Sequence, residues 1–302
     1  MVNETRHAMP WKRVRLSLEM IKFEHSIFAL PFALTGALLA FREVRAELSF
    51  ALLKVFWIVA AMVGARSAAM AFNRVLDAKI DGRNPRTRTR HLPSGILSRG
   101  FVWGFIAVSV CVFLVAAWAL NPLCLELAPL ALAIVGFYSY TKRFTSLSHL
   151  VLGLSLGIAP AAAWIAVTGS LDLRILWLTA AVMFWTAGFD VIYSCQDYDF
   201  DRSEGLFSLP KQFGISQALW IAKFFHLLMV GCLVELVVAF GLGWLSLVGI
   251  AAVVLLLIYE HRLVKPDDLS RVNAAFFTVN GYVSVLFFLF WAADMFLLRV
   301  KV

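Results

Sequence analysis

Charged residues are scarce in this sequence, since only 15% of its 302 residues are Asp, Glu, Lys or Arg. A soluble domain carries about 25%. Hydrophobic residues make up 61% of the chain, which supplies enough apolar residues for roughly nine helices of about 20 residues each. The scarcity of charge excludes an ordinary soluble enzyme and a disordered chain, and it indicates an α-helical integral membrane protein.

Cysteine is also rare, and its spacing excludes two further classes of protein. The chain has four cysteines, and none is part of a CxxC pair or a metal-ligand spacing. The sequence therefore offers no basis for a secreted disulfide scaffold or a zinc site. Because all four lie in or beside apolar segments, we predict that they are small buried hydrophobic residues: Cys111, Cys124, Cys195 and Cys232.

Apolar runs separated by short polar links predict nine membrane-spanning helices. No link is long enough to separate two domains, so we expect residues 1–302 to form one all-α membrane domain. Four helices separate the two acidic clusters described below, which suggests two four-helix halves followed by a ninth helix. The expected spans lie near residues 21–41, 50–73, 100–120, 123–141, 147–168, 174–194, 216–238, 242–260 and 274–298.

Basic residues outnumber acidic ones, and the formal net charge is +8. In a soluble protein this excess would suggest nucleic-acid binding, but cytoplasmic loops of membrane proteins are enriched in Lys and Arg. Most of the basic residues lie in the N-terminal leader and in the loops after the second, fourth, sixth and eighth spans. We therefore expect no nucleic-acid partner, a cytoplasmic N-terminus and a C-terminus on the other side.

The first acidic cluster follows the second expected span. Asn73, Asp77 and Asp81 are four residues apart, so they share one face of a helix. Two carboxylates and an amide oxygen form a surface of hard oxygen ligands that suits Mg²⁺, which usually takes one or two protein carboxylates and completes its shell with water and phosphate oxygens. We predict that these three residues bind metal and that Asp77 has a catalytic role.

The second acidic cluster follows the sixth expected span. Asp190, Asp197 and Asp201 have i, i+7, i+11 spacing, which places them on one face of a continuous helix, whereas Asp199 points away toward solvent. A single aspartate at a helix end is most simply a solvated cap. So many carboxylates on two helix ends of a charge-poor membrane protein indicate function instead. We predict that Asp197 and Asp201 bind metal and that Asp190 and Asp197 are catalytic.

Basic and phenolic side chains accompany both clusters. Carboxylates with Mg²⁺, beside Arg and Lys on the same side of the membrane, form a site for a polyanion such as a diphosphate. The positive-inside rule accounts for most of the arginines in loop 83–90, but not for Arg66 inside an apolar span. Arg66 either binds a substrate anion or forms a structural ion pair with an aspartate of the first cluster. The predicted substrate-binding residues are Arg66, Asn73, Arg83, Arg90, Tyr138, Lys142, Arg143 and Tyr193.

These features resemble the UbiA superfamily of intramembrane aromatic prenyltransferases. Residues 73–81 match the NxxxDxxxD motif of that family, and residues 190–201 match its second aspartate-rich motif. The stretch 90–95, which reads RHLPSG, is similar to the family's RPLPSG, and Tyr138 and Lys142 match its YxxxK element. The resemblance covers nearly the whole chain, and paired motifs four helices apart make it specific.

The resemblance implies a fold and a reaction. It implies nine helices around a central cavity, in which two Mg²⁺ ions bridge the acidic clusters to a prenyl diphosphate. The expected reaction is Mg²⁺-assisted loss of diphosphate, after which an electron-rich aromatic ring attacks the allylic cation. The protein would be a multi-pass enzyme of a bacterial inner membrane, with a prenyl diphosphate, an aromatic acid and the lipid bilayer as its partners.

The acceptor stays open between two aromatic acids. The stretch 190–214 is similar to bacterial members classed as 4-hydroxybenzoate polyprenyltransferase-like, which favours 4-hydroxybenzoate and ubiquinone biosynthesis. Some of these relatives prenylate 1,4-dihydroxy-6-naphthoate in the futalosine route to menaquinone. Both acceptors carry a carboxylate and a ring hydroxyl, and Arg66 or Arg143 could bind either carboxylate.

Three other classes of protein compete with this interpretation. A cation transporter would place acids near mid-span, often in broken helices, whereas these acids lie at span ends beside a basic loop. A CDP-alcohol phosphotransferase also uses Mg²⁺ and spaced aspartates, but the chain lacks that family's single long motif. A purely structural membrane protein would have no reason to keep the acidic residues.

Overall fold

The computed structural model describes residues 10–22 and 26–299, and its regular structure over these ranges is helical apart from one isolated β-bridge between Lys265 and Asp268. Eight helices in this part of the chain are long and apolar enough to cross a membrane. The prediction of an all-α membrane protein is therefore confirmed. The expected first span, 21–41, falls partly on residues 23–25 outside the described part, and the count of nine spans stays a prediction.

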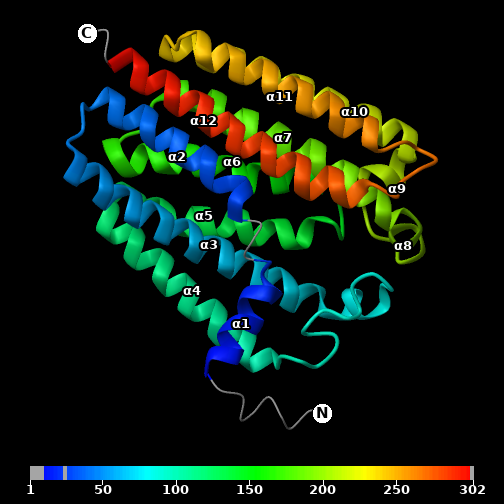
Figure 1. Ribbon diagram of the computed structural model, residues 1–302. Helices are drawn as coiled ribbons and strands as arrows, with labels where there is room; N and C mark the ends of the chain where they lie inside the picture. Colours follow the sequence, from blue (N-terminus) through cyan, green and yellow to red (C-terminus); the bar gives the residue numbers. More distant parts are fainter. Residues whose placement is uncertain (1–9, 23–25, 300–302) are drawn as a thin grey trace.

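The helices follow the predicted apolar runs closely, with boundaries that differ by a few residues in most cases (Figure 1). They are α1 (Pro10–Met20), α2 (Ser26–Glu43), α3 (Leu48–Arg83), α4 (Arg99–Leu120), α5 (Pro122–Thr141), α6 (Ser148–Thr168), α7 (Leu176–Ser194), α8 (Tyr198–Ser203), α9 (Leu209–Phe213), α10 (Ile215–Phe240), α11 (Trp244–Leu263) and α12 (Asn280–Arg299). Two 3₁₀ turns, Leu173–Ile175 and Cys195–Asp197, flank α7, and a π-helix, Ala274–Val279, precedes α12.

Two groups of helices pack along each other (Figure 1). In one group α7 lies between α6 and α10, while α2 contacts both α6 and α12. In the other group α3 packs against α4 and α5, and α5 also contacts α6, which joins the groups. The loop after α3 and the short helices α8 and α9 lie at the same end of the bundle, opposite the end of α12 (Figure 1). The fold therefore brings the two acidic clusters to one end.

Small residues let α6 and α7 approach closely. Gly153 and Gly157 are four residues apart on one face of α6, the small-xxx-small spacing common between membrane helices. A Cβ atom at Gly157 would lie 2.7 Å from the backbone oxygen of Thr179 on α7, and one at Gly153 would meet the backbone oxygen of Met183. The contact thus needs glycine at both positions, and it sets how near α7 lies to the cavity described below.

A buried polar network fixes the junction between the π-helix and α12. Asn280 accepts a hydrogen bond from Trp185 Nε1 at 2.7 Å and donates to Glu260 Oε1 at 2.7 Å. It also donates to the carbonyl oxygen of Ala275, 3.1 Å away inside the π-helix. Because unpaired polar groups are costly in an apolar core, these bonds favour one register for the π-helix.

The outer face of the bundle is apolar, as a lipid-facing surface requires. Trp118 on α4 is 72% exposed and Val238 on α10 is 71% exposed. The prediction of four buried cysteines is confirmed for Cys195 and Cys232, but Cys124 is only partly buried and Cys111 is exposed, so it is wrong for those two. Apolar character alone does not separate the lipid-facing side of a membrane helix from its packed side, because both environments are apolar.

The close α6–α7 contact predicts a difference between two Gly→Ala substitutions. Gly157→Ala should destabilise the protein by roughly 1–3 kcal/mol, because the added methyl group meets backbone atoms that cannot rotate away. Gly231→Ala is the matched control, since Gly231 lies inside α10 and a Cβ there has no neighbour within 4 Å. The control should be neutral or stabilising by up to about 1 kcal/mol. Thermal unfolding of both purified variants in detergent measures the difference, and equal unfolding temperatures would contradict the packing argument.

Candidate active site

A cavity of about 1080 Å³ opens between the two groups of helices. Its wall is apolar where Ala61, Phe113 and Leu156 line it, and it is polar beside the loop that follows α3. Six acidic or amide side chains of the two clusters line this cavity, and Asp199 does not; the six are Asn73, Asp77, Asp81, Asp190, Asp197 and Asp201. The structure thus brings together residues that are more than 100 positions apart in the sequence.

Asp77 is the most deeply buried of these carboxylates, at 1% exposed. The prediction that Asn73, Asp77 and Asp81 share one helix is confirmed, because α3 runs without a break to Arg83. Lys142 Nζ lies 2.7 Å from Asp77 Oδ2, and Arg143 Nη2 lies 2.8 Å from Asp77 Oδ1. Asn73 Nδ2 also donates to Asp77 Oδ2 at 3.1 Å. Two basic side chains and one amide therefore compensate this buried carboxylate.

The loop after α3 turns back and covers the acidic end of that helix. Arg90 Nη1 lies 2.7 Å and 2.8 Å from the two carboxylate oxygens of Asp81. The hydroxyl of Thr87 donates to the backbone oxygen of Asp81 at 3.0 Å, which holds the turn. The basic loop thus supplies a charge partner for the same helix from which it emerges.

Arg86 links this loop to the second acidic cluster. Its Nε and Nη2 atoms both donate to Asp197, and its Nη1 donates to the hydroxyl of Tyr193 at 3.2 Å. Asn84 Nδ2 also donates to Asp197 Oδ1 at 3.1 Å. Burial lowers the pKa of Arg86, but the hydrogen bond and the charge of Asp197 outweigh burial and leave the pKa above its ordinary value. Arg86 therefore stays charged and joins the loop to the end of α7 across the cavity.

The second cluster does not lie on one continuous helix, and that prediction is wrong. Helix α7 ends at Ser194, a 3₁₀ turn covers Cys195–Asp197, and α8 begins at Tyr198. Asp190, Asp197 and Asp201 nevertheless all line the cavity. Asp199 is exposed and does not line it, so its predicted outward direction is confirmed. Because the 3₁₀ turn is only three residues long, the three aspartates stay on the side that faces the cavity.

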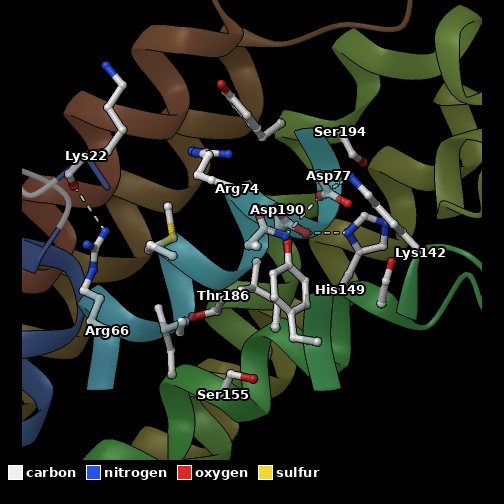
Figure 2. Close-up of a pocket in the computed structure, with 18 of the residues that line it drawn as sticks. Lys22, Arg66, Arg74, Asp77, Lys142, His149, Ser155, Thr186, Asp190 and Ser194 are labelled. Atoms are coloured by element: carbon white, nitrogen blue, oxygen red, sulfur yellow. Dashed lines mark hydrogen bonds and ion pairs between the residues drawn. The ribbon is translucent and has the colours of Figure 1, made fainter. Parts of the chain in front are cut away.

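Asp190 is held by a histidine rather than by a Lys or Arg (Figure 2). His149 on α6 points toward Asp190 on α7, with 2.7 Å between His149 Nδ1 and Asp190 Oδ2. The other ring nitrogen of His149, Nε2, lies 3.3 Å from the backbone nitrogen of Leu209. Only 3% of His149 is exposed. This contact joins α6, α7 and the start of α9 at the cavity wall.

Several predicted substrate contacts lie on the cavity and two do not. Arg83 forms an ion pair with Glu204 at 2.9 Å and does not line the cavity. Arg143 also lies off the cavity, where it binds Asp77 and the backbone oxygen of Leu76 at 3.2 Å. Both arginines therefore support the walls of the site. The predicted contacts that do line the cavity are Arg66, Asn73, Arg90, Tyr138, Lys142 and Tyr193.

Arg66 has a role in holding the chain near the end of α1. It donates hydrogen bonds of 3.3 Å to the backbone oxygens of Ile21 and Lys22 while it also lines the cavity (Figure 2). Arg74, eight residues further along α3, lines the cavity too and donates to the backbone oxygen of Met20 at 3.4 Å. These two arginines attach the C-terminal end of α1 to the cavity wall.

The oxygen ligands of the cavity fit Mg²⁺ that is shared with a phosphate group. Over residues 10–22 and 26–299, no three His, Cys, Asp or Glu side chains lie close enough to hold a metal by themselves. Mg²⁺ does not need such a set, because it commonly takes one or two carboxylates and completes its shell with water and substrate phosphates. Asn73, Asp77 and Asp81 offer oxygen atoms from α3, and Asp197 and Asp201 offer them from the opposite wall.

Among the site residues that sequence reasoning missed, Arg86 and His149 make the closest contacts with its carboxylates. Arg86 is one of several arginines in a loop whose charge the positive-inside rule already explains, so nothing in the sequence singled it out. His149 is the second residue of α6 and lies 41 positions before Asp190. No periodicity relates two residues on different helices, so only the packing of α6 on α7 shows the pair.

Comparison with known protein families gives one match that covers most of the chain. The model of the UbiA prenyltransferase family matches residues 29–296. The 4-hydroxybenzoate octaprenyltransferase of Tolumonas auensis is 32% identical over 246 residues, which cover 80% of this chain and 82% of that protein. The enzyme of the same name from Vibrio atlanticus is 31% identical over 75% of this chain and 81% of its own length.

Solved structures share the fold. The apo structure of a UbiA homolog from Aeropyrum pernix K1 has a TM-score of 0.79 and 37% sequence identity, and the match covers 90% of this chain and 98% of that one. A UbiA homolog from Archaeoglobus fulgidus bound to GPP and Mg²⁺ has a TM-score of 0.72 over 93% of this chain and 99% of that one. Its sequence identity is 19%, so this likeness is one of fold.

The geometry predicts that Arg90 contributes to anion binding and that Arg83 does not. Arg90→Ala should weaken binding of inorganic diphosphate in the presence of Mg²⁺ by roughly 10- to 100-fold, because a charge-assisted hydrogen bond contributes about 1.5–3 kcal/mol. Arg83→Ala is the matched control, since it removes the same group from a position outside the cavity. Isothermal titration of both variants measures the affinities. Equal losses in the two variants would show that general positive charge, rather than the cavity, attracts the anion.

Proposed function

Because the chain belongs to the UbiA prenyltransferase family, we propose that this membrane enzyme transfers a polyprenyl group from a prenyl diphosphate to the ring of an aromatic acid, with 4-hydroxybenzoate as the acceptor in quinone biosynthesis. The curated relatives named above are 4-hydroxybenzoate octaprenyltransferases, which supports this acceptor. The proposed activity depends on Mg²⁺, with two ions.

One observation carries the proposal. Two acidic clusters on α3 and at the end of α7 face one cavity, and each is already paired with basic side chains that a diphosphate could bind. Carboxylates bind Mg²⁺, and Arg and Lys side chains bind phosphate oxygens, so a wall that carries both kinds of group can hold a metal–diphosphate complex. A cation transporter needs no such set of cations beside its acidic groups.

The chain's own side chains suit the departure of diphosphate. Lys142, Arg86 and Arg90 line the cavity beside the carboxylates, where they can donate to phosphate oxygens and stabilise the charge that develops there. Mg²⁺, when bound, would add Lewis-acid stabilisation of the same charge. Asp190, which also lines the cavity, would accept the proton that the aromatic acceptor loses.

The apolar part of the cavity suits the prenyl chain and the acceptor ring. Phe276 of the π-helix packs on Tyr193 with ring centroids 4.2 Å apart, and on Phe189 with centroids 5.2 Å apart. All three rings line the cavity, together with Phe28. Aromatic faces can stabilise an allylic cation electrostatically, and an apolar wall limits its capture by water.

The proposed arrangement in the membrane follows from the basic loops. We propose a bacterial inner-membrane protein of nine spans in two four-helix halves plus one, with the N-terminus and the active-site loops on the cytoplasmic side. The position of the loop after α3 beside α8 and α9 at one end of the bundle supports a single cytoplasmic face for the site (Figure 1). Prenyl diphosphates are charged, so an entrance on the aqueous side suits them.

A direct assay tests the proposal. Membranes that contain the protein are incubated with Mg²⁺, a polyprenyl diphosphate and either 4-hydroxybenzoate or 1,4-dihydroxy-6-naphthoate, and product masses are measured. A product equal to 4-hydroxybenzoate plus one polyprenyl group, with one proton lost, is the expected result. A product from the naphthoate alone would show that the naphthoate is the acceptor and would still support prenyl transfer as the reaction. No prenylated product from either acid would contradict the proposal.

Metal dependence predicts two further outcomes in the same assay. Excess EDTA should abolish product formation, and added Mg²⁺ should restore it. Asp197→Ala should lower kcat by about 100-fold or more, because it removes a proposed metal ligand from the diphosphate end. Asp199→Ala, two residues away but exposed, should change kcat by less than about threefold. Full activity in EDTA, or similar losses in both variants, would rule out the proposed metal site.

A further inference from the structure

Asp190 differs from three other carboxylates of the cavity in the kind of partner that holds it. Asp77, Asp81 and Asp197 each pair with a Lys or Arg side chain. The partner of Asp190 is His149, at 2.7 Å. Lys and Arg carry a positive charge at any ordinary pH, whereas a histidine carries one only when both ring nitrogens are protonated. The charge on His149 therefore decides whether Asp190 is neutralised.

The second nitrogen of His149 determines where the ring proton lies. The backbone N–H of Leu209 donates to Nε2 at 3.3 Å. A nitrogen that accepts a hydrogen bond has a free lone pair and no hydrogen, so the single ring proton lies on Nδ1. Nδ1–H then donates to Asp190 Oδ2. A doubly protonated ring would point an N–H group at the N–H group of Leu209, so the geometry selects a neutral imidazole.

The fold gives this arrangement a structural reason to persist. Leu209 is the first residue of α9, so its N–H group has no acceptor within that helix. Leu209 is 5% exposed and His149 is 3% exposed. A buried N–H group that loses its acceptor leaves its desolvation uncompensated. Protonation of Nε2 would impose that cost, which opposes the charged form of His149.

We propose that His149 is a positioning residue, which orients Asp190 through a hydrogen bond from a neutral imidazole and leaves the carboxylate without a cationic partner, so that Asp190 can accept the acceptor's proton. The inference rests on the proposed function. In the reaction the bond between the prenyl carbon and the diphosphate oxygen breaks, and diphosphate leaves with the electron pair. A carbon–carbon bond forms between the prenyl group and the ring, and the ring proton passes to the Asp190 carboxylate.

A neutral partner matters because proton acceptance needs a basic carboxylate. A Lys or Arg partner would stabilise the ionised carboxylate and weaken it as a base. A neutral donor orients Asp190 without adding a positive charge. The three cation-paired carboxylates suit binding of metal and diphosphate, and Asp190 suits proton transfer. Histidine at position 149 thus lets one aspartate serve in proton transfer while other aspartates of the same cavity bind metal and diphosphate.

Three substitutions at His149 test the inference. His149→Gln keeps both contacts in principle, because one amide can donate to Asp190 and accept from Leu209, and its kcat should stay within about fivefold of the wild type. His149→Leu removes both contacts and should lower kcat by about 100-fold, while KM for the prenyl diphosphate changes less than about threefold. His149→Lys supplies a charged partner and should be as slow as His149→Leu.

A second buried histidine provides the control for folding. His226 on α10 is also 3% exposed but lies away from the cavity lining. His226→Leu should lower the unfolding temperature without a comparable loss of kcat. If His149→Leu and His226→Leu lose stability equally and both keep kcat, His149 has only a structural role and the inference fails. An active His149→Lys variant would also overturn it, since a cation would then serve as well as a neutral donor.

A measurement on the protein without substrate separates this inference from the proposed function. The ¹⁵N spectrum of the full chain labelled in histidine, with the His149 signals assigned by their loss in His149→Gln, should show one protonated nitrogen at neutral pH, namely Nδ1. A doubly protonated ring, or a proton on Nε2, would overturn the inference. Failure of the wild type to form any prenylated acid would overturn the proposed function and leave this readout valid.

Discussion

The pairing of buried carboxylates with cations is the interaction on which the architecture of the site depends. Asp77 and Asp81 are 1% and 4% exposed on a helix that also spans the apolar bundle. An ionised carboxylate in such a place is costly unless it is paired and hydrogen-bonded. The partners come from elsewhere in the chain, at Lys142 after α5 and at Arg90 in the loop after α3. The need to compensate charge therefore draws these segments over one end of the cavity.

These pairs also prepare the cavity for an anionic substrate. A cation that balances a carboxylate in the free enzyme can turn to a phosphate oxygen, and a metal ion can then take its place beside the carboxylate. The charge balance of the wall is preserved in both states, which lowers the cost of binding a diphosphate at membrane depth. Arg86 is well placed for such an exchange, because it joins Asp197 to the basic loop and also contacts Tyr193 in the aromatic wall.

The regular geometry of the α-helix made the arrangement of the first acidic cluster predictable from the sequence. The i, i+4, i+8 spacing of Asn73, Asp77 and Asp81 has a direct meaning on a helix, and α3 continues through all three residues. The helix break in the second cluster could not be predicted, because residues 190–201 contain no Gly or Pro that would indicate the 3₁₀ turn at Cys195–Asp197. Its three aspartates still line the cavity, as predicted, because the irregular stretch is short.

Contacts between elements could not be predicted in the same way. The arginines of loop 83–90 are similar in the sequence, yet Arg83 pairs with Glu204 outside the cavity and Arg90 pairs with Asp81 inside it. A loop has no period from which these directions follow. The pair of His149 and Asp190 depends on the close packing of α6 on α7, which glycines permit but do not specify residue by residue.

A structure of the protein with Mg²⁺ and a non-hydrolysable prenyl thiolodiphosphate tests the central claim most directly. The claim predicts that the diphosphate lies between α3 and the end of α7, with metal ions on Asp77 or Asp81 and on Asp197. Lys142, Arg86 and Arg90 should then contact phosphate oxygens in place of some of their present carboxylate contacts. A diphosphate bound elsewhere, or bound in this cavity while all three cations keep their carboxylate partners and no metal is present, would contradict the account.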